Sequence, residues 1–289
     1  MTTQKQTFAI VTGASAGFGK CLALELASKN HNTILVALPN ENIHSVVQQS
    51  RALGVTSHGY ETDLSVKENI LKFTHWVNSN FNINILINNA GRGGTKCFGD
   101  CDTNYIDGII QLNVATISIM THQLLPNLQK QEQSYILNVA SMASFSPIGY
   151  KTVYPASKAF VLSFSRGLYQ ELKRTSVFVS VVHPGPMMTN SDTTKRIEQQ
   201  GRMAKMGIIS PEKMAKRSLE QLFKRDTVIL IGWMNKLNWL LIKLIPIWIR
   251  LPLLTNIVKR EVKPKQKYQA IPDKNLKTMF SNEEPTSAA

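Results

Sequence analysis

The sequence predicts an α/β protein with one doubly wound parallel sheet, and three observations lead to this fold class. Short apolar segments alternate along the chain with segments of helical spacing, as happens when helices cover both faces of a parallel sheet. The first apolar segment ends in a glycine-rich turn from which a helix starts. The chain has 289 residues, which suits a single large domain better than two.

The expected elements follow one another in a regular order. Runs rich in apolar residues predict strands at 8–12, 33–38, 83–88, 135–141, 177–183 and 227–231, and 57–63 is expected to be a further strand. Apolar residues at helical spacing predict helices at 17–29, 43–52, 105–129 and 154–174. Another helix is expected after Ser210, a good N-cap residue, with Pro211 in its first position. Ligands of such sheets bind beyond the carboxyl ends of the strands, so the residues at these ends are the candidates for function.

The chain continues beyond residue 232 with a very apolar segment, 233–258, that contains three tryptophans. Pro246 and Pro252 are expected to divide it into short helices. Its uncharged stretches between cations are too short to span a bilayer, which takes about 20 residues. Three interpretations remain open for an amphipathic extension over 233–262: a membrane-surface anchor, a lid over the substrate site, or a subunit contact. The domain division is therefore 1–232 catalytic, 233–262 extension and 263–289 a flexible polar tail.

The net charge of +14 is concentrated toward the C-terminus, where residues 233–289 carry +6 and residues 1–232 carry +8. Basic residues beside apolar ones suit a membrane surface better than nucleic acid, because basic and aromatic residues do not interleave as along a strand-binding groove. The start of the chain has no signal-peptide pattern, so a cytoplasmic location is expected, with peripheral membrane contact as an addition. The three cysteines are expected to be reduced thiols, and no metal site is expected.

The glycine-rich turn after the first strand is the first candidate binding site. Glycines let the backbone approach a pyrophosphate, and the N-terminus of the following helix offers free N–H groups and a partial positive charge. The expected cofactor contacts are Gly13, Ser15, Ala16, Gly17, Phe18 and Gly19.

The spacing of these glycines, Gly-x-x-x-Gly-x-Gly, resembles that of the short-chain dehydrogenase/reductase family, and further matches follow in the family's order between about residues 8 and 232. They are Asp63-Leu64, Asn88-Asn89-Ala90-Gly91, Asn113, Ser141, the Tyr154-x-x-x-Lys158 pair and Pro184-Gly185. The resemblance implies a Rossmann-like fold and a nicotinamide dinucleotide. It implies catalytic roles for Asn113, Ser141, Tyr154 and Lys158, and cofactor contacts at Asp63, Leu64, Asn89, Ala90, Gly91, Tyr154, Lys158, Pro184, Gly185, Met187 and Thr189. Met187 stands where the family often has Ile or Val, and residues 190–209 stand where it has a substrate lid; an ordinary surface loop is the alternative.

The chemistry gives its own reason for the Tyr154–Lys158 spacing. Residues four apart on a helix project from the same face, so the ammonium is expected to lower the pKa of Tyr154 from its ordinary value of about 10. A tyrosine whose pKa lies nearer to neutral is a better acid/base group. Ser141, at the end of a strand, is expected to hydrogen-bond the substrate oxygen. The family resemblance adds that Lys158 binds the nicotinamide ribose and that Asn113 holds a water of a proton relay.

The cofactor choice between NADP and NAD stays open, with NADP favoured. Family members that use NAD have an acidic residue at the end of the second strand, where this chain has Ala37, so the repulsion of a 2′-phosphate is missing. The basic partner of that phosphate is missing as well, since Ala16 and Leu38 occupy the places where it would stand.

The expected function is an NAD(P)-dependent oxidoreductase that interconverts a ketone or aldehyde and an alcohol. A hydrophobic, lipid- or steroid-like carbonyl is the expected substrate, and the apolar extension is the only basis for that. A dinucleotide-binding regulatory protein and a membrane-associated scaffold without turnover are the alternatives, against which the complete set of Ser141, Tyr154 and Lys158 counts. A homo-oligomer formed through the helices on either side of the fifth strand is expected by analogy only.

Overall fold

The computed structural model describes residues 6–187 and 208–262, and in them a seven-stranded sheet has the order β3-β2-β1-β4-β5-β6-β7. All six strand pairs are parallel. The strands are β1 (Thr7–Thr12), β2 (Asn32–Ala37), β3 (Ser57–Glu61), β4 (Asn82–Asn88), β5 (Ser134–Val139), β6 (Val177–Val182) and β7 (Val228–Ile229). The doubly wound α/β fold is thus confirmed. The strand order reverses between β1 and β4, which is where such sheets bind ligands.

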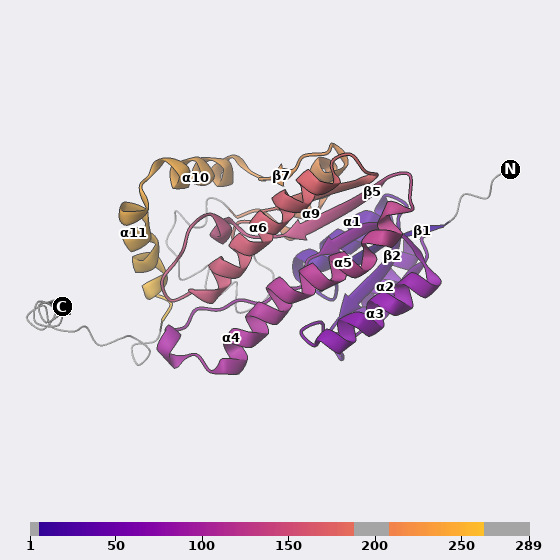
Figure 1. Cartoon of the computed structure of the whole chain (residues 1–289), viewed down its shortest axis with the longest axis horizontal. Helices are drawn as coiled ribbons and strands as arrows, with labels where there is room; N and C mark the ends of the chain where they lie inside the picture. Colours follow the sequence, from indigo (N-terminus) through magenta and orange to yellow (C-terminus); the bar gives the residue numbers. More distant parts are fainter. Residues whose placement is uncertain (1–5, 188–207, 263–289) are drawn as a thin grey trace, which may run out of the picture.

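Helices cover both faces of this sheet. They are α1 (Gly17–Ser28), α2 (Ile43–Ala52), α3 (Lys67–Asn80), α4 (Thr103–Ile110), α5 (Thr116–Gln129), α6 (Val153–Leu172), α9 (Pro211–Phe223), α10 (Trp233–Leu244) and α11 (Ile247–Lys259). Alternate strand residues point to opposite faces, and the two largest of the three apolar clusters form cores on these faces. One core joins the sheet to α1, α2 and α9, and the other joins it to α3, α5 and α6. In Figure 1, α5 and α6 lie in front of the sheet.

The helix α3 was not predicted, although its sequence carries the signal. Ile70, Phe73 and Val77 lie at helical spacing, and all three are fully buried in the second core. The predicted strands at 57–63 and 227–231 end earlier than expected, and β7 has only two residues. The expected cap of α9 is confirmed: the Ser210 side chain accepts a hydrogen bond from the Lys213 N–H, with Pro211 at the helix start.

The single helix predicted at 105–129 is divided. A π-helical segment, η2 (Gln111–Ala115), separates α4 from α5, and Asn113 stands in the middle of it. Segments of this kind interrupt α-helices most often at functional sites. A pattern of apolar residues does not reveal such an insertion, because the helix continues on both sides of it.

The C-terminal extension forms α10 and α11, which lie at the end of the molecule opposite the N-terminus (Figure 1). Pro246 separates the two helices as expected, but Pro252 lies inside α11, so its predicted break is wrong. Pro252 removes one backbone donor from the helix, and the carbonyl that loses it belongs to Trp248, which is 73% exposed. Water can therefore replace the missing hydrogen bond. The segments 1–5, 188–207 and 263–289, with Thr189, most of the expected lid and the expected polar tail, lie outside the described residues.

Candidate active site

The glycine turn joins β1 to α1 at the carboxyl edge of the sheet. Gly13 has φ +64°, a left-handed conformation that favours glycine. A Cβ on Gly19 would collide with the Gly13 carbonyl, so the turn closes only with glycine there. At Ala16, the residue before α1, no described side chain caps the helix, and the first turn has no acidic residue. Free N–H groups at a helix start, beside a turn rich in glycine and small residues, fit a dinucleotide pyrophosphate.

Thr12 and Asn89 hold this turn against the end of β4. The Thr12 hydroxyl accepts hydrogen bonds from the N–H groups of Asn89 (3.0 Å) and Ala90 (2.9 Å). In return, Asn89 Nδ2 donates to the carbonyls of Thr12 (2.9 Å) and Gly13 (3.1 Å). These hydrogen bonds join the glycine turn to the segment after β4, so two of the segments predicted to bind the cofactor form one structural unit. Thr12 was not predicted as a site residue, and only its place beside Gly13 in the sequence could have suggested it.

Two predicted cofactor contacts have their side chains in the apolar cores. Phe18 is 5% exposed and Leu64 is 4% exposed, so these residues can offer a cofactor little beyond their backbone. Asp63 lies on the surface side of the same edge, where its Oδ1 accepts hydrogen bonds from the N–H (2.8 Å) and hydroxyl (2.7 Å) of Ser65.

Gly91 is the point where Asn113 and Lys158 meet. A Cβ on Gly91 would lie 3.0 Å from Asn113 Oδ1 and 3.2 Å from Lys158 Nζ. Asn113 is fully buried; its Oδ1 accepts from the Arg92 N–H, and its Nδ2 donates to the Arg92 carbonyl, both at 2.9 Å. Its Nδ2 also donates to the Ser157 hydroxyl (2.9 Å), which fixes the loop after β4 against α6.

Ser141 lies beside the Tyr154 hydroxyl, and the ring of Tyr154 packs against Gly93. A Cβ on Gly93 would lie 2.7 Å from a ring carbon of Tyr154. Ser141 Oγ also accepts a hydrogen bond from the Ala143 N–H (3.1 Å) at the start of the short 3-10 helix η3 (Met142–Phe145). Lys158 Nζ donates to the Val139 carbonyl at 2.8 Å. The four predicted catalytic residues therefore stand together at the carboxyl ends of β4 and β5.

Burial determines the protonation of this group. Burial raises the pKa of Tyr154, and the hydrogen bond with Ser141 lowers it only in part. Burial also lowers the pKa of Lys158 to about 8. The prediction that the Tyr154 pKa is lowered is thus wrong, because desolvation of the phenol raises this pKa by more than favourable interactions lower it.

His183, at the end of β6, is a further residue of the site that the sequence did not single out. It is fully buried, and its Nδ1 lies 3.1 Å from the Ser141 carbonyl and 2.9 Å from the Ser144 hydroxyl. Burial lowers its pKa to about 4, so it is neutral at physiological pH. A carbonyl only accepts hydrogen bonds, which assigns the ring proton to Nδ1. His183 thus buttresses the backbone of Ser141.

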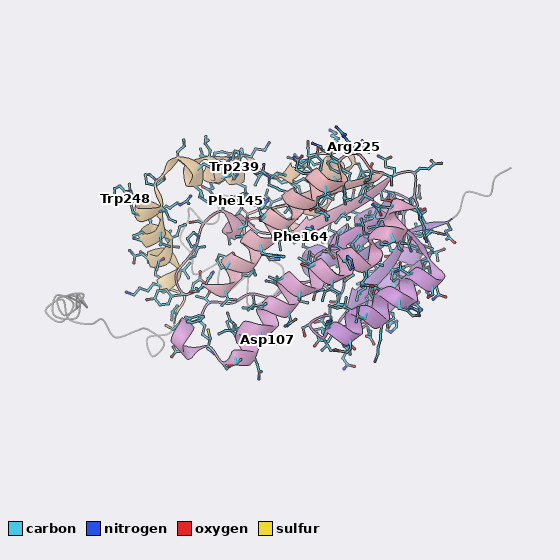
Figure 2. The ribbon with its side chains drawn as sticks, viewed as in Figure 1. Asp107, Phe145, Phe164, Arg225, Trp239 and Trp248 are labelled. Carbon is cyan, nitrogen blue, oxygen red and sulfur yellow. The ribbon has the colours of Figure 1, made fainter. Side chains whose placement is uncertain are left out.

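The His183 ring continues into a chain of aromatic contacts that ends in the extension. Phe145 packs on His183 with 4.3 Å between ring centroids, and Trp239 of α10 meets the Phe145 edge at 6.5 Å. Figure 2 shows Trp239 and Phe145 side by side, and Trp248 at the outer edge of the molecule. Buried Asn235, also from α10, covers Gly185, where a Cβ would lie 2.6 Å from its Oδ1. The first helix of the extension therefore packs directly on Gly185, one of the predicted cofactor contacts.

Pro184 and Met187 are the remaining predicted cofactor contacts within the described residues. The Pro184 carbonyl accepts a hydrogen bond from the Met142 N–H (3.0 Å), which ties the ends of β5 and β6 together. Met187 is partly buried and packs against the first apolar core.

Between the glycine turn and the loop after β2, Ser15 donates a hydrogen bond to the Glu41 carboxylate at 2.7 Å. Ala37, as expected, offers no charge. The carboxylate of Glu41, which follows β2, nevertheless reaches the glycine turn. The sequence alone does not reveal this contact, since it joins two loops 26 residues apart.

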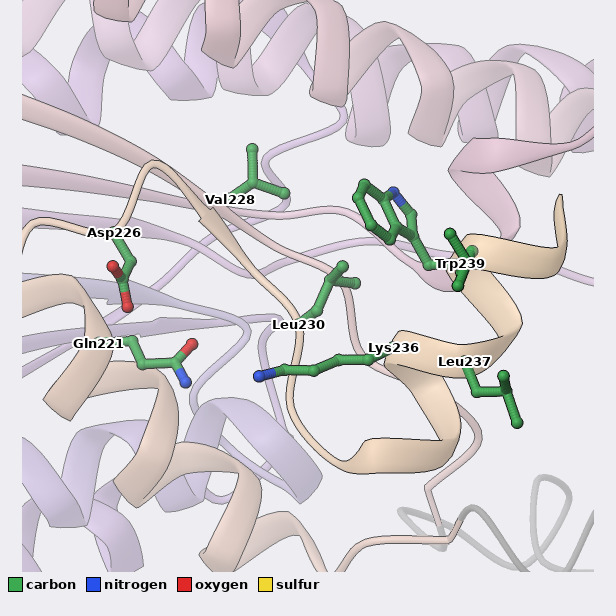
Figure 3. A pocket seen from close by; sticks show the side chains of 8 residues that line it. Gln221, Asp226, Val228, Leu230, Lys236, Leu237 and Trp239 are labelled. Carbon is green, nitrogen blue, oxygen red and sulfur yellow. The ribbon is translucent and has the colours of Figure 1, made fainter. Parts of the chain in front are cut away.

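A separate hollow of about 520 Å³ lies at the β7 edge of the sheet, away from Tyr154. Its lining consists of Gln221, Asp226, Val228, Leu230, Lys236, Leu237, Trp239 and Leu240. In Figure 3, Lys236 extends from α10 across this hollow toward Gln221 of α9. The lining includes none of the predicted catalytic side chains.

Two further properties concern the described part of the chain. Over residues 6–187 and 208–262, no three His, Cys, Asp or Glu side chains are arranged to hold a metal ion. Among the helices that these ranges contain, none is both long and apolar enough to cross a membrane.

The sequence is similar to those of known oxidoreductases. A family model described as short chain dehydrogenase matches residues 7–200. An uncharacterized oxidoreductase of Staphylococcus epidermidis is 31% identical over 207 residues, which cover 69% of this chain and 89% of that protein.

Two solved structures are similar over nearly the whole chain. One is a bulky-bulky ketone specific alcohol dehydrogenase from Comamonas testosteroni, with a TM-score of 0.70, 22% identity, and coverage of 99% of this chain and 98% of that one. The other is a short-chain dehydrogenase from Sphingobium yanoikuyae in complex with NADPH, with a TM-score of 0.70, 22% identity and 98% coverage of both chains. At this level of identity the two structures support the fold, and they cover the C-terminal extension as well.

Proposed function

The chain belongs to the short-chain dehydrogenase/reductase family of oxidoreductases, and we propose that it reduces a hydrophobic ketone or aldehyde with NADPH, with Tyr154 as the proton donor. The observation that carries this proposal is the convergence of Tyr154, Ser141, Lys158 and Asn113 at the carboxyl edge of the sheet, beside the cradle formed by the glycine turn and Asn89. Each of these groups has a chemical task at a reacting carbonyl.

Tyr154 and Ser141 act on the carbonyl oxygen. The dinucleotide supplies the hydride to the carbonyl carbon when it is bound. Tyr154 transfers its phenolic proton to the oxygen, and Ser141, which lies beside Tyr154, donates a hydrogen bond to the same oxygen as negative charge develops there. A phenol whose pKa is raised by burial holds its proton at neutral pH, which suits the direction of reduction.

Lys158 and Asn113 serve the proton donor indirectly. With a pKa of about 8, Lys158 is mostly an ammonium at neutral pH and stabilises the tyrosinate left behind after proton transfer. Asn113 holds the loop after β4 on α6, so that Gly91 and Gly93 stay against Lys158 and Tyr154.

The proposed cofactor contacts run along the edge from β1 to β6. They comprise Gly13, Ser15, Ala16, Gly17, Phe18, Gly19, Asp63, Leu64, Asn89, Ala90, Gly91, Tyr154, Lys158, Pro184, Gly185 and Met187 within the described residues, and Thr189 outside them. The choice of NADP is supported by the uncharged Ala37 at the end of β2 and by the NADPH bound in the similar structure from Sphingobium yanoikuyae. Glu41 on Ser15 works against a 2′-phosphate, and we expect it to limit the preference.

The hydrophobic substrate is supported by the position of the extension. Helix α10 packs on Gly185 through Asn235 and on His183 through Trp239 and Phe145, and we expect apolar side chains of the extension to reach the carbonyl site from there. The similar alcohol dehydrogenase from Comamonas testosteroni is specific for bulky-bulky ketones. We propose that residues 1–232 form the catalytic domain and that residues 233–262 complete its wall.

Oxidation of NADPH in the presence of a panel of ketones and aldehydes of increasing apolar size tests this function. We expect turnover that rises with apolar size and is faster with NADPH than with NADH. A dinucleotide-binding protein without turnover, the main alternative, would bind NADPH and oxidise it with none of the panel.

The outer side of the extension supports a second, peripheral contact, and we propose that it lies on an anionic membrane surface. Residues 233–260 include five cations and no acidic residue, and large apolar side chains are exposed along both helices. The most exposed are Trp233 (68%), Leu244 (68%) and Trp248 (73%). Apolar side chains flanked by cations are what an interfacial helix needs.

Flotation with vesicles of phosphatidylserine and phosphatidylcholine tests this contact. We expect the wild type to float with anionic vesicles and the Trp248→Ser variant to float less. Equal flotation of both would count against the membrane contact. Sedimentation of the same two proteins without vesicles would reveal a homo-oligomer that uses this surface instead.

A further inference from the structure

The loop before Tyr154 has a strained residue at its centre. Tyr150 has φ +63°, a left-handed conformation that bulky side chains rarely adopt and that costs free energy unless the surroundings fix it. Its loop leads directly into the proton donor, because the Tyr154 N–H donates to the Lys151 carbonyl at 3.0 Å. Whatever holds residues 149–151 therefore also places the start of α6.

The C-terminal extension holds this loop on both sides of Tyr150. Thr255 of α11 accepts a hydrogen bond from the Gly149 N–H at 3.1 Å, and a Cβ on Gly149 would lie 2.6 Å from Thr255 Cγ2. Glu261, just beyond α11, pairs with Lys151 Nζ at 3.1 Å. The Glu261 side chain is only 4% exposed, so this ion pair is shielded from solvent and stronger than a surface pair.

The same carboxylate holds the loop on the other side of Tyr154. Glu261 Oε2 accepts a hydrogen bond from the Thr95 hydroxyl at 2.8 Å. The next residue, Lys96, donates its N–H to the Tyr150 carbonyl at 2.8 Å, so the two loops are also joined directly. This second loop includes Gly93, which packs on the Tyr154 ring. Glu261 thus bridges the loop after β4 and the loop after β5.

We propose that Thr255 and Glu261 are positioning residues of the carbonyl site, which fix the two loops beside Tyr154 and thereby set the binding of the carbonyl substrate. This proposal rests on the proposed function only in naming a carbonyl as the substrate. The contacts of Thr255 and Glu261 with the two loops are present without any ligand. It gives the inner side of the extension a role that the sequence left open between lid, anchor and subunit contact. The extension is then a strap across the site, joined to it by a buried carboxylate.

The effect expected from removing these contacts falls on substrate binding more than on chemistry. Lys158, Ser141 and the cofactor cradle make no contact with Thr255 or Glu261 among the hydrogen bonds of the described residues. Loss of one buried, charge-assisted contact is expected to loosen the loops roughly tenfold. The KM for the carbonyl should then rise by roughly that factor, while kcat and the Kd for NADPH change less than about twofold.

Four variants of the full chain separate positioning from general stability. Glu261→Ala removes both bridges, and Thr255→Val keeps the side-chain shape but loses the acceptor. Thr255→Ser keeps the hydroxyl and should behave as wild type. Lys259→Gln removes an exposed charge from the same helix and serves as the matched control.

Hydrogen–deuterium exchange without substrate and steady-state kinetics with a ketone turned over by the wild type are the two measurements. Glu261→Ala and Thr255→Val should exchange faster at residues 93–97 and 148–153 and raise KM, and the two controls should do neither. Unchanged exchange in both loops overturns the proposal, as does faster exchange with an unchanged KM. A parallel loss of Tm, NADPH binding and kcat in Glu261→Ala also overturns it, because that is a general structural role.

These measurements also distinguish this proposal from the proposed function. If the wild type reduces no carbonyl, the proposed function fails by itself, and the exchange data still show whether Thr255 and Glu261 hold the loops.

Discussion

Replacing Lys158 by methionine should abolish turnover and at the same time make the fold more stable at neutral pH. Lys158 is 4% exposed, and burial lowers its pKa from 10.5 to about 8. Burial of the Lys158 ammonium lowers the free energy of unfolding, and the function requires this charge in the active site. Methionine has a similar length and no charge, so it removes this cost without leaving a large cavity.

The magnitude follows from the pKa of Lys158 and from its hydrogen bond. A shift of about 2.5 pKa units corresponds to roughly 3 kcal/mol against folding at pH 7. Methionine leaves the Val139 carbonyl without the Lys158 donor, which costs about 1–2 kcal/mol. We therefore expect the variant to unfold with a free energy about 1–2 kcal/mol larger than that of the wild type at pH 7.

The difference in unfolding free energy between Lys158→Met and the wild type should change with pH in one direction only. Below about pH 8, Lys158 is protonated in both the folded and the unfolded state, so its full cost is present. Between about 8 and 10.5, the folded state has lost the proton and the unfolded state has not, so the wild type becomes more stable as pH rises. The advantage of Lys158→Met should thus shrink by about 1.4 kcal/mol per pH unit above pH 8 and reverse between about pH 9 and 10, so that the wild type is the more stable protein at pH 10.5.

Urea unfolding at pH 7, 9 and 10.5 measures this difference, with Lys72→Met, a change at an exposed lysine of α3, as the control. The control should show no such trend, because its ammonium is solvated in both states. A Lys158→Met variant that is less stable than the wild type at pH 7 would refute the reasoning. A stability difference that does not change with pH would refute it equally.

Three further predictions concern the cofactor cradle and the carbonyl oxygen. Glu41→Gln should raise the preference for NADPH over NADH by roughly threefold to tenfold, because it removes a negative charge near the expected 2′-phosphate; an unchanged ratio of the two kcat/KM values would contradict this. Gly19→Ala should weaken NADPH binding by at least roughly a hundredfold in fluorescence titration, since its Cβ would meet the Gly13 carbonyl, and wild-type affinity would show that the turn is not the cradle. Ser141→Ala should lower kcat by roughly a hundredfold or more at an unchanged Kd for NADPH, and a kcat near that of the wild type would remove Ser141 from the chemistry.

The fold was predictable from local patterns because the strands are short apolar runs and the glycine turn stands directly after the first of them. The same patterns brought Asn113, Ser141, Tyr154 and Lys158 to one edge of the sheet, since parallel strands place their carboxyl ends together. The π-helical segment around Asn113 was not predictable, because the contacts that the Asn113 amide makes there are with Arg92 and Ser157, which are distant in the sequence.

Contacts between distant segments account for the other differences. His183 touches Ser141 across 42 residues, and Glu261 reaches Thr95 across 166 residues, so neither contact has a signal in the local sequence. The pKa of Tyr154 shows the same limit: spacing on a helix predicted that Lys158 lowers this pKa, whereas in the packed structure burial raises it.

Turnover of the Tyr154→Phe variant tests the central claim most directly. Phenylalanine keeps the ring that packs against Gly93 and loses only the hydroxyl beside Ser141. Oxidation of NADPH with a hydrophobic ketone should fall by roughly a hundredfold to ten-thousandfold, the usual contribution of an acid/base group, while NADPH binding stays within about twofold of the wild type. Turnover close to that of the wild type, with cofactor binding intact, would contradict the assignment of Tyr154 as the proton donor.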